Sequence, residues 1–271
     1  MLCTASSSGS SFCPLPSPAD SPVSITSLYD GLTSEQLARR LGLPRVVALD
    51  ETTSTLDVAH TLGGEGAAAG TLILADTQTA GRGRLGRAWT SERGAGIWLT
   101  LIERPSDPAA IEVLSLRIGI ALAVALDGFV DNAVSLKWPN DVYVAGRKLA
   151  GILVEARWRE STLEWVAVGI GINIRPPASE ARAAGVRPGT SRLSILDAII
   201  PGVRFAAAQP GHLSRDELEA FARRDYARGR RCVQPAKGVV QGIDARGALH
   251  IDLGSEVVAV RSGSLVLKEE Q

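Results

Sequence analysis

Cysteine and histidine are scarce in this 271-residue chain, with three residues of each. Cys3, Cys13 and Cys232 have neither the spacing of zinc ligands nor the even number of a disulfide framework. The histidines are scattered, so the sequence predicts no metal held by the protein alone and no Ser-His-Asp triad. Unpaired cysteines favour a reducing compartment, and we expect a cytoplasmic protein.

Net charge is also lacking, because 29 basic side chains balance 29 acidic ones. A general nucleic-acid binder is usually basic over a whole domain, so we expect no DNA partner. Residues 1–27 are rich in Ser and Pro and contain no apolar core of a secretory signal. We expect this segment to be a disordered tail or part of an over-extended start.

Long hydrophobic runs are few. The most apolar segment, residues 109–130, contains Glu112, Arg117 and Asp127. Three charged side chains in one segment argue against a membrane span. We therefore predict a core helix that begins at Pro108, and no membrane contact.

A loop rich in glycine and arginine is the most informative feature that is present. The stretch 75–90, ADTQTAGRGRLGRAWT, lies between two segments that read as buried strands, 71–75 and 96–102. Glycines let the backbone approach a ligand, and guanidinium groups bind carboxylate and phosphate oxygens. GRGRLG formally matches the dinucleotide fingerprint GxGxxG, but a strand follows it where that fingerprint needs a helix. We predict a loop that folds over an anion.

Lys137 lies inside an otherwise apolar strand, between Leu136 and Trp138. Alone, such a lysine either reaches solvent or meets an anion in a pocket, and the arginine loop favours the second interpretation. The chain has no Walker sequence, so a nucleotide would be bound in another way. Fixed cations suit a reaction between two anions, such as carboxylate attack on a triphosphate.

Hydroxyl side chains gather where a predicted strand, 45–49, meets a predicted helix, 56–62. The run is Asp50–Thr55, DETTST. These hydroxyls can cap the helix or point at a ligand held over its N-terminus, and the sequence leaves both readings open.

The chain divides into four predicted parts. Residues 1–27 form the tail, and 28–44 form a short helical lead-in that is too small for a winged DNA-binding domain. Residues 45–227 form the main domain, where short connections predict a mixed or antiparallel sheet with helices on one face. Residues 228–271 contain short strands divided by glycine turns, which predict a small SH3-like barrel.

Four motifs in order resemble those of the biotin protein ligases: GRGRLGRAW (81–89), KWPND (137–141), RKLAGILVE (147–155) and GIGIN (169–173). The terminal barrel with GIDARGAL fits as well. The resemblance implies an α+β fold whose central mixed sheet is akin to class II aminoacyl-tRNA synthetases, plus the C-terminal barrel, in the form without an N-terminal DNA-binding domain.

The resemblance also implies a two-step reaction. ATP and biotin, with Mg²⁺, form biotinyl-5′-adenylate and pyrophosphate. The acyl group then passes to one lysine of a biotin carboxyl carrier protein, such as that of acetyl-CoA carboxylase. A bifunctional ligase and biotin-operon repressor, or a lipoate- or octanoyl-type acyl ligase, are the alternatives. Two copies could pair through open sheet edges as a homodimer.

Individual residues can be assigned to this reaction. We expect Lys137 and Arg82 to be catalytic and Asp141 to brace its turn. The biotin-binding set is predicted to be Ser54, Thr55, Leu56, Gln78, Gly81, Arg82, Gly83, Arg84, Lys137 and Gly151. The set that binds ATP or the adenylate is predicted to be Arg84, Arg87, Trp89, Asn173 and Lys268.

Two positions depart from the family's pattern. Leu56 stands where asparagine is common, so one polar contact to the ligand is missing, which weakens binding by on the order of 1 kcal/mol. Lys268 stands where relatives often have arginine, so a bidentate fork is replaced by a point charge.

Overall fold

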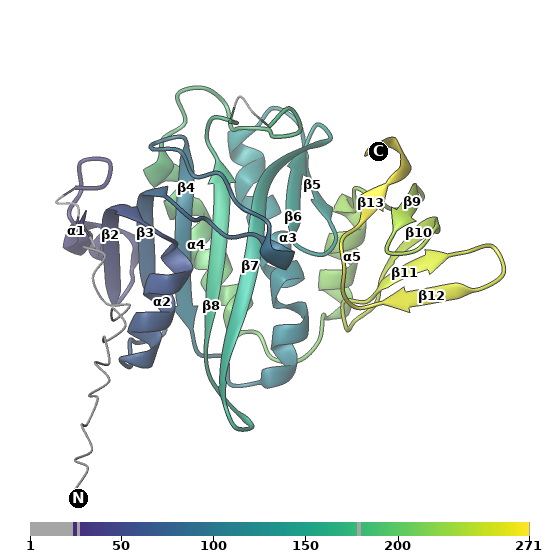
Figure 1. Ribbon diagram of the computed structural model, residues 1–271, viewed down its shortest axis with the longest axis horizontal. Helices are drawn as coiled ribbons and strands as arrows, with labels where there is room; N and C mark the ends of the chain where they lie inside the picture. Colours follow the sequence, from purple (N-terminus) through teal and green to yellow (C-terminus); the bar gives the residue numbers. More distant parts are fainter. Residues whose placement is uncertain (1–23, 26–27, 178–179, 271) are drawn as a thin grey trace, which may run out of the picture.

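The computed structural model describes residues 24–25, 28–177 and 180–270 as a large sheet with helices and a small sheet beside it (Figure 1). The predicted disorder of residues 1–27 falls on residues outside these ranges, apart from Ser24–Ile25. Those two residues form strand β1 and pair with the first long strand, so the prediction is wrong for them.

The large sheet has eight strands in the order β1-β2-β3-β4-β8-β7-β6-β5. Among these described strands, β2 and β3 are parallel and the other neighbours are antiparallel, so the predicted mixed sheet is confirmed. The bounds are β2 Arg45–Thr52, β3 Thr71–Gln78, β4 Gly96–Glu103, β5 Val134–Lys137, β6 Asp141–Val144, β7 Arg147–Arg159 and β8 Thr162–Asn173.

Helices cover both faces of the large sheet, so the prediction of helices on one face is wrong. The helices are α1 Ser34–Leu41, α2 Thr55–Gly64, α3 Leu114–Leu126, α4 Arg192–Ala208 and α5 Arg215–Arg224. In β3, Leu72 and Leu74 face the main core under α3 and α4, whereas Ile73 faces a second cluster under α2. Alternate residues of a strand point to opposite faces, and here both sets are apolar, so both faces are buried. Figure 1 shows α2 in front of the sheet and α3 and α4 behind it.

The predicted core helix is present, although it is regular α-helix only over α3. It is flanked by single 3₁₀ segments, Pro108–Val113 and Asp127–Phe129. By length and composition Pro108–Phe129 could cross a membrane, and 56% of its most apolar window is buried in the fold. The helix packs against α4, β5 and β7, which places its apolar side chains in the main core.

The small sheet is antiparallel, in the order β12-β11-β10-β9-β13. Its strands are β9 Arg231–Gln234, β10 Gly238–Ile243, β11 Leu249–Asp252, β12 Val257–Val260 and β13 Val266–Leu267. It contacts the rest of the protein through Gly247, whose carbonyl accepts a hydrogen bond of 2.9 Å from the Trp138 indole nitrogen. A Cβ at Gly247 would lie 2.8 Å from Leu116, so the turn approaches α3 closely because it lacks a side chain.

Arg117 of α3 is the most deeply buried arginine of the fold's core, with 3% of its side chain exposed. Its Nε donates to Glu217 at 2.6 Å, and its Nη atoms donate to the carbonyls of Gln209, Gly211 and His212. The guanidinium therefore joins α3, the loop after α4, and α5.

We expect Arg117→Met to lower the free energy of unfolding by about 3 kcal/mol, because Glu217 and the carbonyls lose their shared donor. Urea unfolding measures the change. The matched control is Arg215→Ala, whose side chain is 90% exposed and pairs within its own helix with Glu219. A loss for Arg117→Met no larger than that of the control would contradict the assignment.

Asp127 supplies an acid-sensitive contact between α3 and α5. The hydrogen bonds from Arg224, at 2.6 and 3.2 Å, lower the pKa of its carboxyl below the ordinary value. A carboxyl whose folded-state pKa is depressed stabilises the fold above its unfolded pKa of about 4 and loses this effect as pH falls further. We therefore expect Asp127→Asn to destabilise the protein at pH 6 and to do so less at pH 3, measured by urea unfolding at both. If Asp127→Asn lowers the free energy of unfolding equally at pH 6 and pH 3, the contact with Arg224 is not the source of this pH dependence.

Candidate functional site

A pocket of about 480 Å³ opens between the large and small sheets. Its walls come from the start of α2, the arginine loop, the β5–β6 turn, β7, β8 and the small sheet. The predicted site residues that line it are Ser54, Thr55, Leu56, Gln78, Arg82, Gly83, Arg84, Arg87, Trp89, Lys137 and Gly151. The structure thus gathers residues that are far apart in the sequence, while Gly81, Asn173 and Lys268 do not line this pocket.

Trp89 lies flat against the large sheet where β7 and β8 carry paired glycines. Gly151 and Gly171 are cross-strand partners, and a Cβ on either would lie within 2.9 or 2.5 Å of the Trp89 ring. The indole can therefore approach the sheet only because these two positions have no side chain. Among the described residues its buried Nε1, which lies against Gly171, has no hydrogen-bond partner.

The end of the pocket near α2 is lined by neutral hydrogen-bonding groups. Ser54 is the N-cap of α2, and its Oγ accepts from the Leu56 N–H at 3.3 Å. The Gln78 Oε1 accepts from the Thr55 N–H at 2.8 Å and from the Thr55 hydroxyl at 3.2 Å. The capping interpretation of the hydroxyl run is confirmed for Ser54, which also lines the pocket, while its contact with a ligand stays a prediction. Leu56 is 3% exposed and forms an apolar part of this wall.

The arginine loop is closed on itself by backbone hydrogen bonds. The Trp89 N–H donates to Gly81 O at 2.8 Å, and the Gly83 N–H donates to Arg87 O at 2.7 Å. A Cβ at Gly81 would lie 2.4 Å from the Trp89 carbonyl oxygen, which explains why a glycine stands there. Gly81 therefore shapes the loop from behind the pocket.

The three arginines of the loop point to different partners. Arg82 pairs with Asp57 at 2.9 Å and with Glu155 at 3.4 Å, on the α2 side. Arg84 donates to Asn140 Oδ1 and to the Gly263 carbonyl, both at 3.4 Å, and its burial lowers the pKa of its guanidinium. Arg87 is also on the side of the small sheet, where it donates to the Ser264 hydroxyl at 3.2 Å. Arg84 and Arg87 thus tie the loop to the small sheet.

Two lysines line the pocket, and the sequence reasoning singled out only one of them. Lys137 is 7% exposed, and its ammonium lies 3.4 Å from the Tyr143 hydroxyl. Lys148, at the start of β7, pairs with Asp141 at 2.7 Å and lies 5.0 Å from the centre of the Trp89 ring. Lys148 was missed because residues 145–148 read as a turn in the sequence, where a lysine is ordinarily solvated, whereas the structure places it in β7. The carboxylate of Asp141, which was expected to brace a turn, faces this ammonium.

Two residues predicted to bind ATP or the adenylate lie elsewhere. Asn173, at the end of β8, donates to the Lys148 carbonyl at 3.4 Å. Lys268 follows β13 and lines a separate depression on the small sheet, together with Arg231 and Lys237. Their contact with ATP stays a prediction.

The pocket contains few metal ligands. Within the described residues, no group of three or more His, Cys, Asp or Glu side chains is placed to hold a metal ion. Asp141 and Glu269 are acidic residues of the lining. This donor set fits Mg²⁺, which is usually bound by one or two carboxylates and the phosphates of a nucleotide.

Comparison with known proteins gives the chain its family. The model of the biotin/lipoate A/B protein ligase family matches residues 47–173. The biotin–acetyl-CoA-carboxylase ligase of Mycobacterium tuberculosis is 32% identical over 221 residues, which cover 73% of this chain and 79% of the relative. This chain belongs to the biotin protein ligase family.

Further relatives agree at the level of sequence and fold. The bifunctional ligase/repressor BirA of Bacillus subtilis is 38% identical over 145 residues, 53% of this chain and 43% of that protein. The chain therefore spans less than half the length of this relative. The R40G mutant of the biotin protein ligase from Aquifex aeolicus, solved in complex with biotin, superposes with a TM-score of 0.63 at 25% identity, covering 82% of this chain and 97% of that one.

We expect Gly171→Ala to displace Trp89 from the sheet and to lower the free energy of unfolding by about 1–3 kcal/mol, as overpacking does. The measurement is urea unfolding. Gly128→Ala is the matched control, since no atom lies within 4 Å of its added Cβ. If both variants unfold at the same urea concentration, the close contact between the indole and Gly171 does not contribute to the stability of the fold.

Proposed function

We propose that this chain ligates biotin to a specific lysine of a biotin carboxyl carrier protein, with biotinyl-5′-adenylate as the intermediate. The observation that supports this most directly is the division of the pocket into two ends. Neutral hydrogen-bonding groups line the α2 end, where Arg82 is paired with Asp57 and Glu155, and Arg84 and Arg87 line the end next to the small sheet. Biotin has the matching division, with a neutral ring headgroup and a carboxylate tail.

The cationic end suits the first step. A carboxylate oxygen must attack the α-phosphorus of ATP while the bond to pyrophosphate breaks, and two unit charges 4 Å apart repel by about 4 kcal/mol at an effective dielectric of 20. Lys148 of β7 and the two loop arginines, Arg84 and Arg87, would flank the place where these anions meet. Positive groups that are already fixed by Asp141, Asn140 and Ser264 need little reorganisation as charge moves to the leaving pyrophosphate.

The neutral end suits recognition of the ring. We propose that Ser54, Thr55 and Gln78 hydrogen-bond the headgroup and that Leu56 contacts an apolar part of it. Trp89 would separate the two ends and pack against the adenylate. Arg82 would leave Asp57 and Glu155 when the loop closes, so that water is kept from the mixed anhydride.

The second step needs access for a protein lysine. Its ε-amine attacks the acyl carbonyl, an amide bond forms, and AMP leaves. The opening of the pocket between the two sheets suits this approach, since a lysine side chain is long and narrow. The names of the relatives from Mycobacterium tuberculosis and Paracoccus denitrificans, both biotin–acetyl-CoA-carboxylase ligases, support a carboxylase carrier as the partner.

Several finer statements belong to the same proposal. Mg²⁺ would accompany ATP, held in part by Asp141 or Glu269. The large sheet would be akin to that of class II aminoacyl-tRNA synthetases, the four predicted parts would be the domain division, and the small sheet at 228–271 would be an SH3-like barrel. The protein would act in the cytoplasm, where the buried thiol of Cys232 stays reduced. It would not bind DNA. A homodimer stays a prediction.

The direct test is transfer of labelled biotin to a purified carrier domain, with ATP, Mg²⁺, biotin and enzyme omitted in turn. We expect label on a single carrier lysine only when all are present. Replacement of biotin by lipoate or octanoate, followed by transfer, would favour the acyl-ligase alternative. Protection of the chain's own promoter in footprinting would favour a repressor.

We expect Lys148→Ala and Lys137→Ala each to slow adenylate formation by at least about a hundredfold, on the order of 2.7 kcal/mol of transition-state stabilisation. Pyrophosphate exchange measures this step, and the melting temperature shows that each variant is folded. Arg215→Ala, which removes an exposed cation of α5 outside the pocket, is the control and should stay within about twofold of the unaltered protein. Near-normal exchange would remove the altered lysine from the mechanism.

A further inference from the structure

Ser91 is buried, with 5% of its surface exposed, and it does not line the pocket. Its hydroxyl nevertheless contacts two groups that shape the pocket. The Oγ accepts from Gln78 Nε2 at 2.8 Å and donates to the Trp89 carbonyl at 3.3 Å. One hydroxyl thus joins the polar end of the pocket to the residue that carries the indole.

The hydrogen bonds around Gln78 allow one orientation of its amide. The Thr55 backbone N–H can only donate, so the atom that faces it at 2.8 Å must be Oε1. Gln78 Nε2 must then face Ser91, whose hydroxyl can accept because its own hydrogen goes to the Trp89 carbonyl. One hydrogen of Nε2 is used by Ser91, and no hydrogen bond among the described residues uses the other. Because Gln78 lines the pocket, this second N–H is the candidate donor to a ligand.

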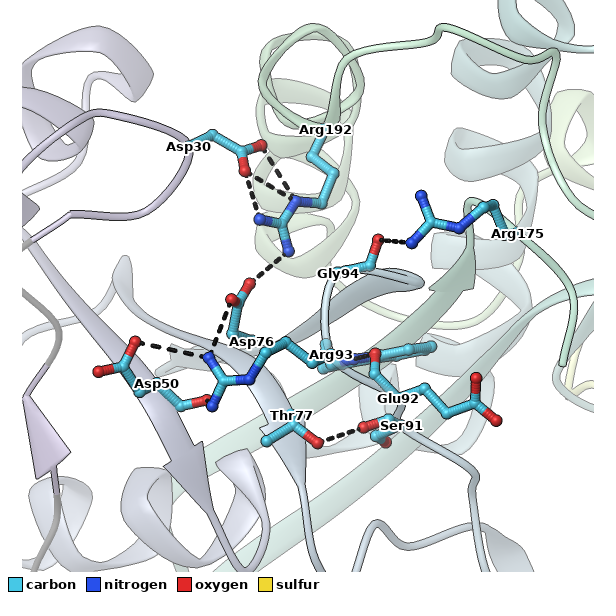
Figure 2. Close-up of polar contacts among 11 residues, drawn as sticks. Asp30, Asp50, Asp76, Thr77, Ser91, Glu92, Arg93, Gly94, Arg175 and Arg192 are labelled. Atoms are coloured by element: carbon cyan, nitrogen blue, oxygen red, sulfur yellow. Dashed lines mark hydrogen bonds and ion pairs between the residues drawn. The ribbon is translucent and has the colours of Figure 1, made fainter.

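The segment that carries Ser91 is held from several sides (Figure 2). The Ser91 carbonyl accepts from the Thr77 hydroxyl at 2.7 Å. Two residues further on, Arg93 pairs with Asp76 at 3.4 Å and with Asp50 at 3.7 Å. The Gly94 carbonyl accepts from Arg175 at 3.1 Å.

This network continues into the fold. Arg192, 12% exposed, pairs with Asp76 at 2.6 Å and also with Asp30. Its guanidinium lies 4.2 Å from the centre of the Tyr29 ring. The residues before α1 and the start of α4 thus fix Asp76, and Asp76 with Arg93 fixes the segment of Ser91. Because these contacts hold the Ser91 backbone in place, the Ser91 hydroxyl also has a defined position.

We propose that Ser91 is a positioning residue for recognition of the ligand headgroup. It holds the Gln78 amide as a donor to a carbonyl oxygen of a neutral cyclic headgroup, and it fixes the distance between that donor and Trp89. This rests on the proposed biotin ligase function. Without the hydroxyl, Gln78 Nε2 loses its acceptor, and only the Thr55 contacts to Oε1 then hold the amide in the orientation that suits the ligand. Binding weakens, whereas the cations at the other end of the pocket are unchanged.

The test compares Ser91→Ala, Ser91→Thr and the exposed control Ser194→Ala in the full chain. Binding of biotin is measured by titration calorimetry, and KM and kcat are measured by pyrophosphate exchange. We expect Ser91→Ala to raise the Kd and KM for biotin about tenfold, which corresponds to one lost hydrogen bond, and to change kcat by less than about twofold. Ser91→Thr, which keeps the hydroxyl, should restore most of the affinity.

A double-mutant cycle separates positioning from a general loss of structure. In a Gln78→Ala background, Ser91→Ala should weaken biotin binding by less than about twofold, because the amide that it orients is gone. An equal loss in both backgrounds would overturn the proposal, and so would a fall in kcat with an unchanged KM. Failure of the unaltered protein to bind biotin would overturn the ligase function instead, so the two failures are distinguishable.

Discussion

The close approach of an indole to a β-sheet is the constraint on which the pocket depends. Trp89 can lie against β7 and β8 because Gly151 and Gly171 face it as a cross-strand pair without side chains. Its position determines where the arginine loop returns to the sheet, since the Trp89 backbone N–H closes the loop at Gly81. It also gives the Lys148 ammonium an aromatic face. The packing of Trp89 against the two glycines therefore determines the positions of the arginine loop, of this wall of the pocket and of the Lys148 ammonium.

Local chemistry made much of the fold predictable. The bounds of β8, Thr162–Asn173, can be read from the sequence, since its apolar run is framed by clear turns. Thr33 and Ser214 both form capping boxes, and Gly42 ends α1 in the left-handed conformation that favours glycine. These features depend on residues within one turn of each other, so the sequence contains the whole argument.

What sequence reasoning missed depends on contacts between distant segments. α4 continues through Pro201 to Ala208, where the local sequence suggests an earlier end, because its buried face packs on α3. α2 lies on the second face of the sheet because β3 and β4 are apolar on both sides. Arg82 was expected to meet an anionic ligand, and in this structure it is paired with Asp57 and Glu155, residues that no local pattern connects to the loop.

The pocket walls belong to two sheets that share one hydrophobic core and are also joined by hydrogen bonds, between Trp138 and Gly247 and between the arginine loop and residues 263–264. A ligand that touches both walls adds a bridge between them. By thermodynamic linkage, occupancy and the attachment of the small sheet must reinforce each other. Exchange of backbone amide hydrogens at the contacts between the two sheets would then slow in proportion to ligand affinity. A substitution that weakens these contacts would also weaken ligand binding, although the substituted residue does not touch the ligand.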